Sequence, residues 1–257
     1  MNLILSSFHR CLSMKYIACL LIVVMGCTSP EAQTTPPTTG LLPTAPTTGT
    51  LFAAYGLDKL GLDQTAFNLA MRGMELVPKK KPFLLIADMT QPSSAKRLYV
   101  LDLTKKEVIL RTYVAHGQNS GGLMATHFSN ASDSKQTSLG FYRVMGRYHG
   151  KHGLSLKLKG LEKGFNDNVF ARNIVLHGAD YVCEDTVRAK GRPGHSEGCP
   201  AIPHAASKLI INRVEGGACL FIYSPDPTYL ATSSFVNAPG TACPAEAGLQ
   251  RKSALSR

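Results

Sequence analysis

Two residues of this sequence could do thiol chemistry together, namely Cys199 and the earlier His177. A cysteine attacks a carbonyl carbon only as its thiolate, so its pKa must be lowered or its proton must be taken by a base such as imidazole. Gly198 directly precedes the cysteine, and a glycine lets a substrate approach the backbone closely. The amides of Gly198 and Cys199 could then donate hydrogen bonds to a developing oxyanion. The segment therefore predicts an acyl-transfer site, with a disulfide through Cys199 and a structural role for His177 as the alternatives.

The elements on either side of these residues are the ones that such a site needs. Residues 174–176 read Ile-Val-Leu, a short apolar run typical of a buried strand, and His177 and Gly178 stand at its end. Beyond the cysteine, segment 203–214 predicts a helix, because its leading proline suits the first helical position. The positive end of that helix would stabilise a thiolate. Its apolar face would consist of Ala206, Leu209, Ile210 and Val214.

Short β-branched and aromatic runs with glycine-rich connections predict a mainly β fold around the site. The predicted strands are residues 83–88, 97–103, 107–114, 142–148, 154–158, 173–176 and 218–223. Many short strands favour a sandwich or barrel over a parallel α/β sheet. Segment 51–81 predicts a helical N-terminal extension that packs on this domain or forms a short lid, and segment 225–257 predicts a loosely structured tail.

A known family carries the same residues. A His-Gly pair at a strand end followed by Ser-x-Gly-Cys is the signature of the YkuD-type L,D-transpeptidase, and the chain resembles the murein L,D-transpeptidase catalytic domain family. The resemblance covers about residues 82–224 and includes RLYVLDL, TYVAHGQNSGG, ATHFSN, TSLGFY, GKHGLSLKLKGLEKGFNDN and ACLFIY. It implies a YkuD-type β-sandwich or barrel-like catalytic domain with a few flanking helices.

The resemblance also implies roles for single residues. Cys199 would be the nucleophile and His177 the general base and acid. His195, Ser196 and Gly198 belong to the motif that would form the oxyanion hole. Many relatives carry an arginine two positions after the cysteine, where this chain has an alanine.

Four further residues are predicted to lie along the substrate groove. Arg192 could replace the missing arginine, or could be a solvated surface residue. His116 and Gly117 follow a strand and begin a flexible loop that could border a bound peptide, or that could be a plain glycine-rich loop. Gly178, beside the predicted base, is expected to contact substrate as well.

The N-terminus reads as a targeting segment. Basic residues precede the apolar run 17–25, which is too short to span a bilayer comfortably and resembles a signal-peptide core. The run ends in Val-Met-Gly before Cys27, which resembles a bacterial lipobox in which Cys27 is acylated. Residues 1–26 are then a lipoprotein signal peptide, with an ordinary cleaved signal as the alternative, and residues 27–50 are a Thr/Pro-rich tether. No aspartate follows Cys27, which favours anchoring in the outer membrane on the periplasmic side of the envelope.

Other clusters of histidine and cysteine carry less information. His149 and His152 lie in a polar turn and are expected to be exposed. With the histidines near Cys199 they invite a zinc site, but their spacings fit no usual closed zinc pattern, so no metal or organic cofactor is expected. Cys183 could lie near the site, or could pair with Cys219 or with Cys243, while the apolar strand around Cys219 favours a core position.

Charge restricts the partners. The 257 residues carry a formal net charge of +11, which favours polyanionic neighbours such as wall polymers or lipid headgroups. The basic residues are scattered, with residues 79–81 as the one lysine run, and a signal peptide argues against nucleic acid. We expect a monomer that contacts peptidoglycan stem peptides and, through its lipid, a membrane.

These observations predict a cysteine-dependent L,D-transpeptidase of the cell wall. It would release D-alanine from a tetrapeptide stem and transfer the acyl group to an amine, which gives a 3→3 cross-link. Water in place of the amine would make the same site an L,D-carboxypeptidase. A non-catalytic peptidoglycan-binding lipoprotein, and a redox or metal protein that uses Cys183 and Cys199, are the remaining hypotheses.

Overall fold

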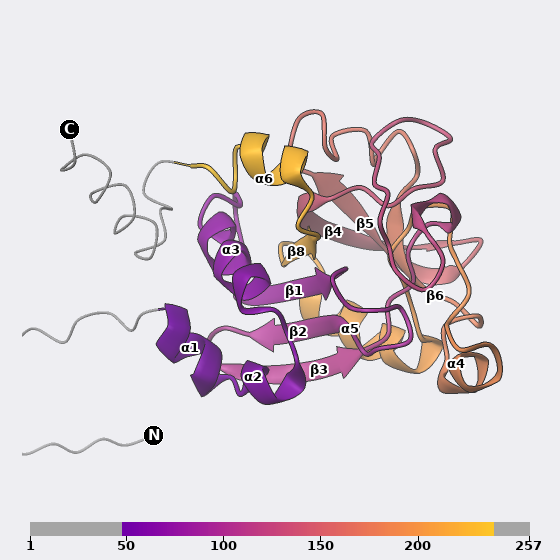
Figure 1. The fold of residues 1–257 in the computed structure, drawn as a ribbon, viewed down its shortest axis with the longest axis horizontal. Coiled ribbons are helices and arrows are strands. Elements are labelled where there is room, and N and C mark those ends of the chain that lie inside the picture. The colour runs from indigo at the N-terminus through magenta and orange to yellow at the C-terminus, as the bar shows by residue number, and fades with distance from the viewer. Residues whose placement is uncertain (1–47, 239–257) are drawn as a thin grey trace, which may run out of the picture. The chain divides into compact units, whose positions relative to one another are not determined.

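The computed structural model of the protein describes residues 48–238 (Figure 1). The predicted signal peptide, the lipidation site at Cys27 and the partner cysteine Cys243 lie outside these residues. The first helix, α1 (Thr48–Ala54), begins inside the segment predicted to be a tether. No helix within the described part of the chain is both long enough and apolar enough to cross a membrane.

One eight-stranded sheet forms the centre of the molecule, in the order β3-β2-β1-β8-β4-β5-β6-β7 (Figure 1). The strands are β1 (Phe83–Asp88), β2 (Leu98–Asp102), β3 (Glu107–Thr112), β4 (Gly140–Gly150), β5 (Gly153–Gly160), β6 (Val175–Gly178), β7 (Ala201–Ile202) and β8 (Cys219–Tyr223). Neighbouring strands are antiparallel except for the pairs β1/β8 and β6/β7. Ala115, just after β3, bridges to Ala201 of β7, so the two ends of the sheet meet and the sheet curls into a barrel-like form. The expectation of a mainly β, barrel-like fold is confirmed.

Within the described residues, three helices precede the sheet. They are α1, α2 (Leu57–Leu60) and α3 (Gln64–Met74), and their apolar side chains join the core of the sheet. Asp63 caps α3 by accepting a hydrogen bond of 2.8 Å from the Ala66 amide. A Cβ at Gly73 would lie 2.1 Å from the ring of Phe141, so this helix reaches β4 only because residue 73 has no side chain.

Helix α5 (His204–Val214) packs against β5 and β6, the strand that carries His177. Its buried residues are Ile210, Ile211 and Val214, whereas the side chain of Leu209 is exposed. The predicted apolar face was therefore wrong at Leu209, and Ile211 is buried in its place.

The segment after β8 is ordered through residue 238, so the prediction of a loose tail was wrong there. Asp226 accepts from the Tyr229 amide at 2.8 Å and begins helix α6 (Pro227–Thr232). The buried hydroxyl of Tyr229 donates to Glu162 at 2.9 Å, and Ser233 donates to the second oxygen of the same carboxylate. Burial raises the pKa of Glu162, against the lowering effect of these donors. Helix α6 is thus tied to the core through a buried carboxylate.

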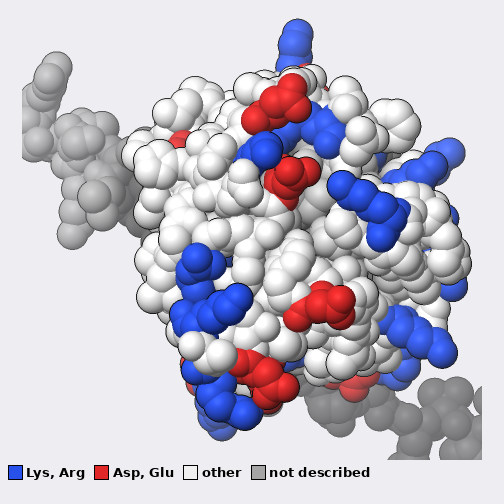
Figure 2. Space-filling model, turned by 90° about the vertical axis from the view of Figure 1, so that its right-hand side faces the viewer, with Lys and Arg blue, Asp and Glu red and all other residues white. Residues whose placement is uncertain are grey.

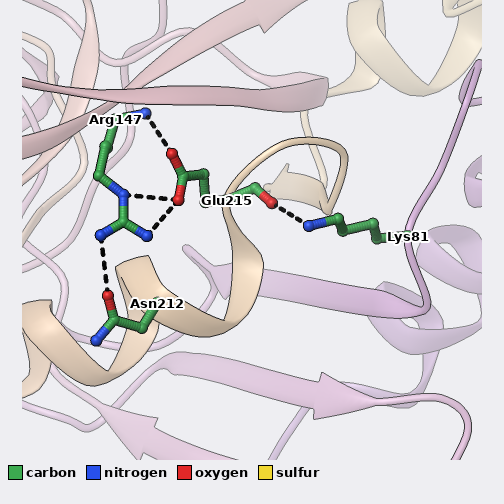
Figure 3. A network of polar contacts seen from close by, with 4 residues as sticks. All are labelled: Lys81, Arg147, Asn212 and Glu215. Atoms are coloured by element: carbon green, nitrogen blue, oxygen red, sulfur yellow. Dashed lines mark hydrogen bonds and ion pairs between the residues drawn. The ribbon is translucent and has the colours of Figure 1, made fainter.

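A polar network fixes the far end of α5 (Figure 3). The guanidinium of Arg147 on β4 pairs with the carboxylate of Glu215, with one hydrogen bond of 2.6 Å, and donates to Asn212 at 3.2 Å. The ammonium of Lys81 donates to the Glu215 backbone carbonyl at 2.7 Å. These side chains lie at the surface, so solvent screens their charges, and they link the C-terminal end of α5 to β4 and to the segment before β1.

The surface carries both signs of charge. On the face in Figure 2, which holds α4 (Glu184–Lys190), Lys and Arg side chains are interspersed with Asp and Glu. No continuous basic patch appears on this face. Cys183, Cys199 and Cys219 are free thiols, which excludes the alternative of a Cys183–Cys219 bridge, and Cys219 is a buried core residue as expected.

Candidate active site

Cys199 and His177 line one cavity of about 590 Å³. It lies between the β4–β5 hairpin, the segment that leads into β6 and the turn that precedes Cys199. Its lining is Tyr148, Gly150, Lys151, His152, Arg172, Asn173, Ile174, Val175, His177, Tyr181, His195, Ser196, Glu197 and Cys199. Another cavity, of about 670 Å³, lies between residues 128–131 and 163–168 and holds neither residue.

The orientation of His177 suits a base. Its ring is buried at the end of β6, and Nδ1 lies 2.9 Å from the Gly178 carbonyl oxygen. A carbonyl oxygen only accepts hydrogen bonds, so Nδ1 carries the proton and Nε2 holds the lone pair in the neutral ring. Burial lowers the pKa of His177, and the charges of His152, His204 and Lys151 act in the same direction. The imidazole is therefore neutral near pH 7 and able to accept a proton.

The environment of Cys199 keeps it as a thiol. Sγ accepts a long hydrogen bond of 3.5 Å from the Val175 amide and lies 3.9 Å from the Asn173 carbonyl oxygen. Burial raises the pKa of the thiol, against the lowering effect of the Val175 amide, Lys151 and Arg172. A neutral thiol and a neutral imidazole that line the same cavity fit proton transfer during the attack rather than a preformed thiolate–imidazolium pair.

The turn before Cys199 is built by Ser196 and Gly198. The Ser196 hydroxyl donates to the Cys199 carbonyl oxygen at 2.6 Å and accepts from the Gly198 amide at 3.1 Å. Gly198 has φ 116°, which a residue with a side chain rarely adopts, and a Cβ there would lie 2.8 Å from the Gln136 carbonyl oxygen. Because the Gly198 amide is used inside the turn, it is not the oxyanion donor that the sequence predicted, and the Cys199 amide is the remaining motif candidate.

A family model now bears on this geometry. The model described as the L,D-transpeptidase catalytic domain matches residues 58–223. The chain belongs to this family. The expected family is therefore confirmed, and the match also includes helices α3 and most of α2.

Solved structures of L,D-transpeptidases resemble the chain at low identity. The enzyme from Mycobacterium smegmatis is 12% identical over 56% of this chain and 59% of its own, with a TM-score of 0.35. One from Mycobacterium tuberculosis is 13% identical over 56% and 58%, with a TM-score of 0.34. One from Xylanimonas cellulosilytica is 13% identical over 67% and 92%, with a TM-score of 0.32. The chain thus spans about three fifths of the two mycobacterial structures, and no curated protein sequence matches it.

Arg172, rather than the predicted Arg192, lines the cavity of Cys199. Arg192 donates to the Pro193 carbonyl oxygen at 2.9 Å and lies 3.1 Å from His195, and it is not among the described residues that line the cavity. Arg172 lines the cavity and lowers the pKa of Cys199. The proposed substitution by Arg192 was therefore wrong.

The guanidinium of Arg172 also fixes a loop. It donates to Ser129 O at 2.9 Å, Ser134 Oγ at 3.0 Å, Gln136 O at 2.8 Å and Ser138 Oγ at 2.7 Å. This loop, residues 129–138, packs against Gly198, as the clash of a Cβ with Gln136 shows. Arg172 was missed because only its position one residue before the strand segment 173–176 marks it in the sequence.

His116 is a structural residue, and its predicted contact with substrate was wrong. The ring is fully buried, with Arg97 donating to Nδ1 at 2.7 Å and Nε2 facing the Gly121 carbonyl oxygen at 3.2 Å. Burial and the neighbouring Arg97 charge lower the pKa of His116 to about 4. Its backbone carbonyl accepts from the Ser196 amide at 3.1 Å, so the buried pair supports the catalytic turn from behind.

The two predicted glycines serve close packing. The Gly117 amide donates to Thr137 Oγ1 at 3.0 Å, and a Cβ at Gly117 would lie 2.3 Å from the Lys135 carbonyl oxygen. A Cβ at Gly178 would lie 2.5 Å from the His204 ring. Neither glycine is among the residues that line the cavity of Cys199, although Gly178 lines a smaller neighbouring cavity.

His195 does reach the cavity. Its Nε2 lies 3.2 Å from the Gly122 carbonyl oxygen, and its ring packs on His116 with centroids 5.0 Å apart. Helix α5 begins at His204, after β7, close to the start that the sequence predicted at residue 203. Within residues 48–238, no group of three or more His, Cys, Asp and Glu side chains is arranged to hold a metal ion.

His152 is another residue whose environment the sequence did not predict. It was expected to be exposed in a polar turn, whereas it is half-buried and its ring stacks on that of His177, with centroids 4.1 Å apart and planes inclined by 20°. His149, three residues earlier, is exposed as expected. The turn reaches His177 only because β4 pairs with β5 and β5 pairs with β6. This long-range arrangement leaves no local pattern in the sequence.

Proposed function

We propose that this chain is a peptidoglycan L,D-transpeptidase in which Cys199 is the nucleophile and His177 the general base and acid. The observation that carries the proposal is one cavity, in a catalytic domain of this family, lined by both the thiol and an imidazole whose Nδ1 is fixed by Gly178. The substrate is a tetrapeptide stem, attacked at the carbonyl of its third residue. No metal or cofactor is required by this chemistry.

In the first half-reaction, His177 Nε2 takes the thiol proton while Sγ bonds to the carbonyl carbon. The tetrahedral intermediate collapses as the C–N bond breaks, and the same proton passes from His177 to the departing amine of D-alanine. A thioester on Cys199 remains. The Cys199 amide is the motif group available to stabilise the oxyanion.

In the second half-reaction, an amine on a neighbouring stem attacks the thioester. A C–N bond forms, the C–S bond breaks, and His177 carries a proton from the amine to the sulfur. The product is a 3→3 cross-link and a regenerated thiol. Water in place of the amine gives a tripeptide, and the enzyme is then an L,D-carboxypeptidase.

The sequence supports a position for the enzyme in the bacterial envelope. Acylation of Cys27 would anchor the chain, on the periplasmic side, to the outer membrane, and the Thr/Pro-rich tether would let the catalytic domain reach the wall. The domain would act as a monomer without nucleic acid. Labelling with a clickable fatty acid in cells, with Cys27→Ala as control, tests the anchor, and equal labelling of both chains would contradict it.

The test of the activity is mass spectrometry of disaccharide-tetrapeptides incubated with the full chain and, in parallel, with Cys199→Ala. A Cys199-dependent dimer that lacks one D-alanine establishes the transpeptidase, and a tripeptide alone establishes the carboxypeptidase. If neither product depends on Cys199 in a folded protein, the catalytic proposal fails and a peptidoglycan-binding role takes its place.

A further inference from the structure

The β4–β5 turn places a second imidazole in the active-site cavity. His152 lies at the tip of this hairpin and stacks on His177 at a centroid distance of 4.1 Å. It lines the cavity of Cys199 and also a neighbouring cavity of about 360 Å³ that holds Asp180, Tyr181 and His204. Within residues 48–238, no hydrogen bond to a ring nitrogen of His152 is formed, so the ring is not used to hold the turn together.

The proton balance of the two half-reactions shows that the second one needs an additional proton acceptor. In acylation, the thiol proton ends on the departing amine, and His177 alone suffices. The acceptor arrives as an ammonium near pH 7, because amines titrate at about pH 8–10. It must lose one proton to become nucleophilic and a second when the amide forms, and only the second returns to the sulfur.

We propose that His152 is a catalytic base for the acceptor: it takes the first proton from the acceptor's ammonium and releases it to solvent through the neighbouring cavity. The inference rests on the proposed function and assigns a residue to its second half-reaction. After this transfer, the neutral amine attacks the thioester, the C–N bond forms, the C–S bond breaks, and His177 moves the second proton to the sulfur.

The groups that face His152 support this assignment over the other candidates. Burial and the adjacent Lys151 lower the pKa of His152, and Glu197 raises it, so the ring is neutral near pH 7. Tyr181 is unsuited, because burial raises its pKa to about 12. The titratable and charged groups that line the two cavities with His152 are Tyr148 and Lys151 on the hairpin, Arg172 before β6, His177 on β6, Asp180 and Tyr181 after β6, His195, Glu197 and Cys199 in the turn, and His204 on α5.

Two other imidazoles near the cavity are already engaged. His195 Nε2 lies 3.2 Å from the Gly122 carbonyl oxygen and 3.1 Å from Arg192. His204 is 3.4 Å from Asp180 and does not line the cavity of Cys199. Among the histidines of residues 48–238, His152 is the one that stacks on His177 and lines both cavities.

The test is His152→Phe in the full chain, because phenylalanine keeps a stacked ring and removes the titratable nitrogens. His149→Phe is the matched control on the same hairpin, at an exposed position. Single-turnover release of D-alanine reports acylation, and the ratio of dimer to tripeptide reports how the thioester is shared between amine and water. Both are measured by mass spectrometry with disaccharide-tetrapeptide between pH 6.5 and pH 10.

For His152→Phe at pH 7 we expect D-alanine release within about threefold of wild type and a dimer-to-tripeptide ratio at least about tenfold lower. The ratio should recover toward pH 10, where the acceptor amine loses its proton without help. An unchanged ratio at pH 7 overturns the inference. An equal loss of acylation and transfer also overturns it, because it indicates that His152 only positions His177. If wild type forms no thioester-derived product, the proposed function itself has failed.

Discussion

The two buried histidines His116 and His177 look alike in the sequence and differ in the molecule. Each follows an apolar strand and is followed by glycine, each is buried, and burial lowers the pKa of each. Both ring nitrogens of His116 are engaged, by Arg97 and by the Gly121 carbonyl oxygen. His177 is held at Nδ1 only, and its ring lines the cavity of Cys199. An accessible nitrogen, more than a shifted pKa, distinguishes the candidate base from the structural residue.

Replacing each histidine by glutamine is the most direct way to break this comparison. We expect His177→Gln to lower the rate of D-alanine release by about 10²–10⁴-fold, because a general base is lost. His116→Gln should keep most of the activity per folded molecule, since an amide can still accept from Arg97. The measurement is D-alanine release by both variants, corrected for the folded fraction. Near-equal losses in the two variants would mean that the two roles were assigned wrongly.

We expect His116 to make the free energy of unfolding decrease in acid. Its folded pKa of about 4 lies below the ordinary 6.5, so between these values the unfolded chain binds more protons and the free energy of unfolding falls as the pH falls. The full difference of about 2.5 pH units corresponds to roughly 3 kcal/mol, present above pH 6.5 and lost toward pH 4. Urea unfolding from pH 7.5 to pH 4.5 should show this slope, and His116→Gln should flatten it. A slope unaffected by the substitution would contradict the assignment.

Replacing His116, which accepts a hydrogen bond from Arg97, tests the structural role of His116 at neutral pH. His116→Leu leaves a buried guanidinium with one bond fewer, which we expect to lower the free energy of unfolding by about 2 kcal/mol. The double variant Arg97→Met with His116→Leu should recover part of that loss, because no charge then remains unpaired. Chemical denaturation of wild type, Arg97→Met, His116→Leu and the double variant measures the coupling free energy. Strictly additive losses would exclude an interaction between the two side chains.

The two arginines near the site give the smallest predicted effect. Arg172→Ala should lower kcat/KM by about tenfold, or about 1.4 kcal/mol, since the loop 129–138 and Cys199 both lose a cation. Arg192→Ala should stay within about twofold of wild type, because Arg192 does not line the cavity and reaches it only through its contact with His195. Steady-state kinetics of D-alanine release compares the pair, and a larger effect at Arg192 would reverse our assignment.

Local sequence patterns predicted the elements of the fold better than their arrangement. Runs of apolar and β-branched residues marked seven of the eight strands, but β7 is only two residues long and carries no such pattern. The order of strands, with β8 between β1 and β4, depends on pairing between distant segments. Helix α6 was missed although Asp226 followed by Pro227 is a helix-start signal, because the surrounding composition resembles a loose tail.

In the candidate site too, local patterns predicted residues better than contacts between distant segments. Cys199, His177 and Ser196 were predicted because all three belong to one known family motif. Arg97, which donates a hydrogen bond to Nδ1 of His116, lies 19 residues away from it in the chain, and no known motif connects the two residues. Likewise His152 reaches His177 only through the pairing of β5 with β6. Contacts made across the sheet are set by tertiary packing, which a single sequence does not display.

The place of β8 has a consequence for how the chain assembles on the ribosome. Residues 219–223 are synthesised after all the other strands, yet β8 lies between β1 and β4 and joins the two halves of the sheet (Figure 1). Until it emerges, the buried strand β1 and the apolar start of β4 have open edges, which invite pairing with other chains. The nascent chain therefore remains in two incomplete halves, and the step that commits it to the native topology follows translation of its last strand.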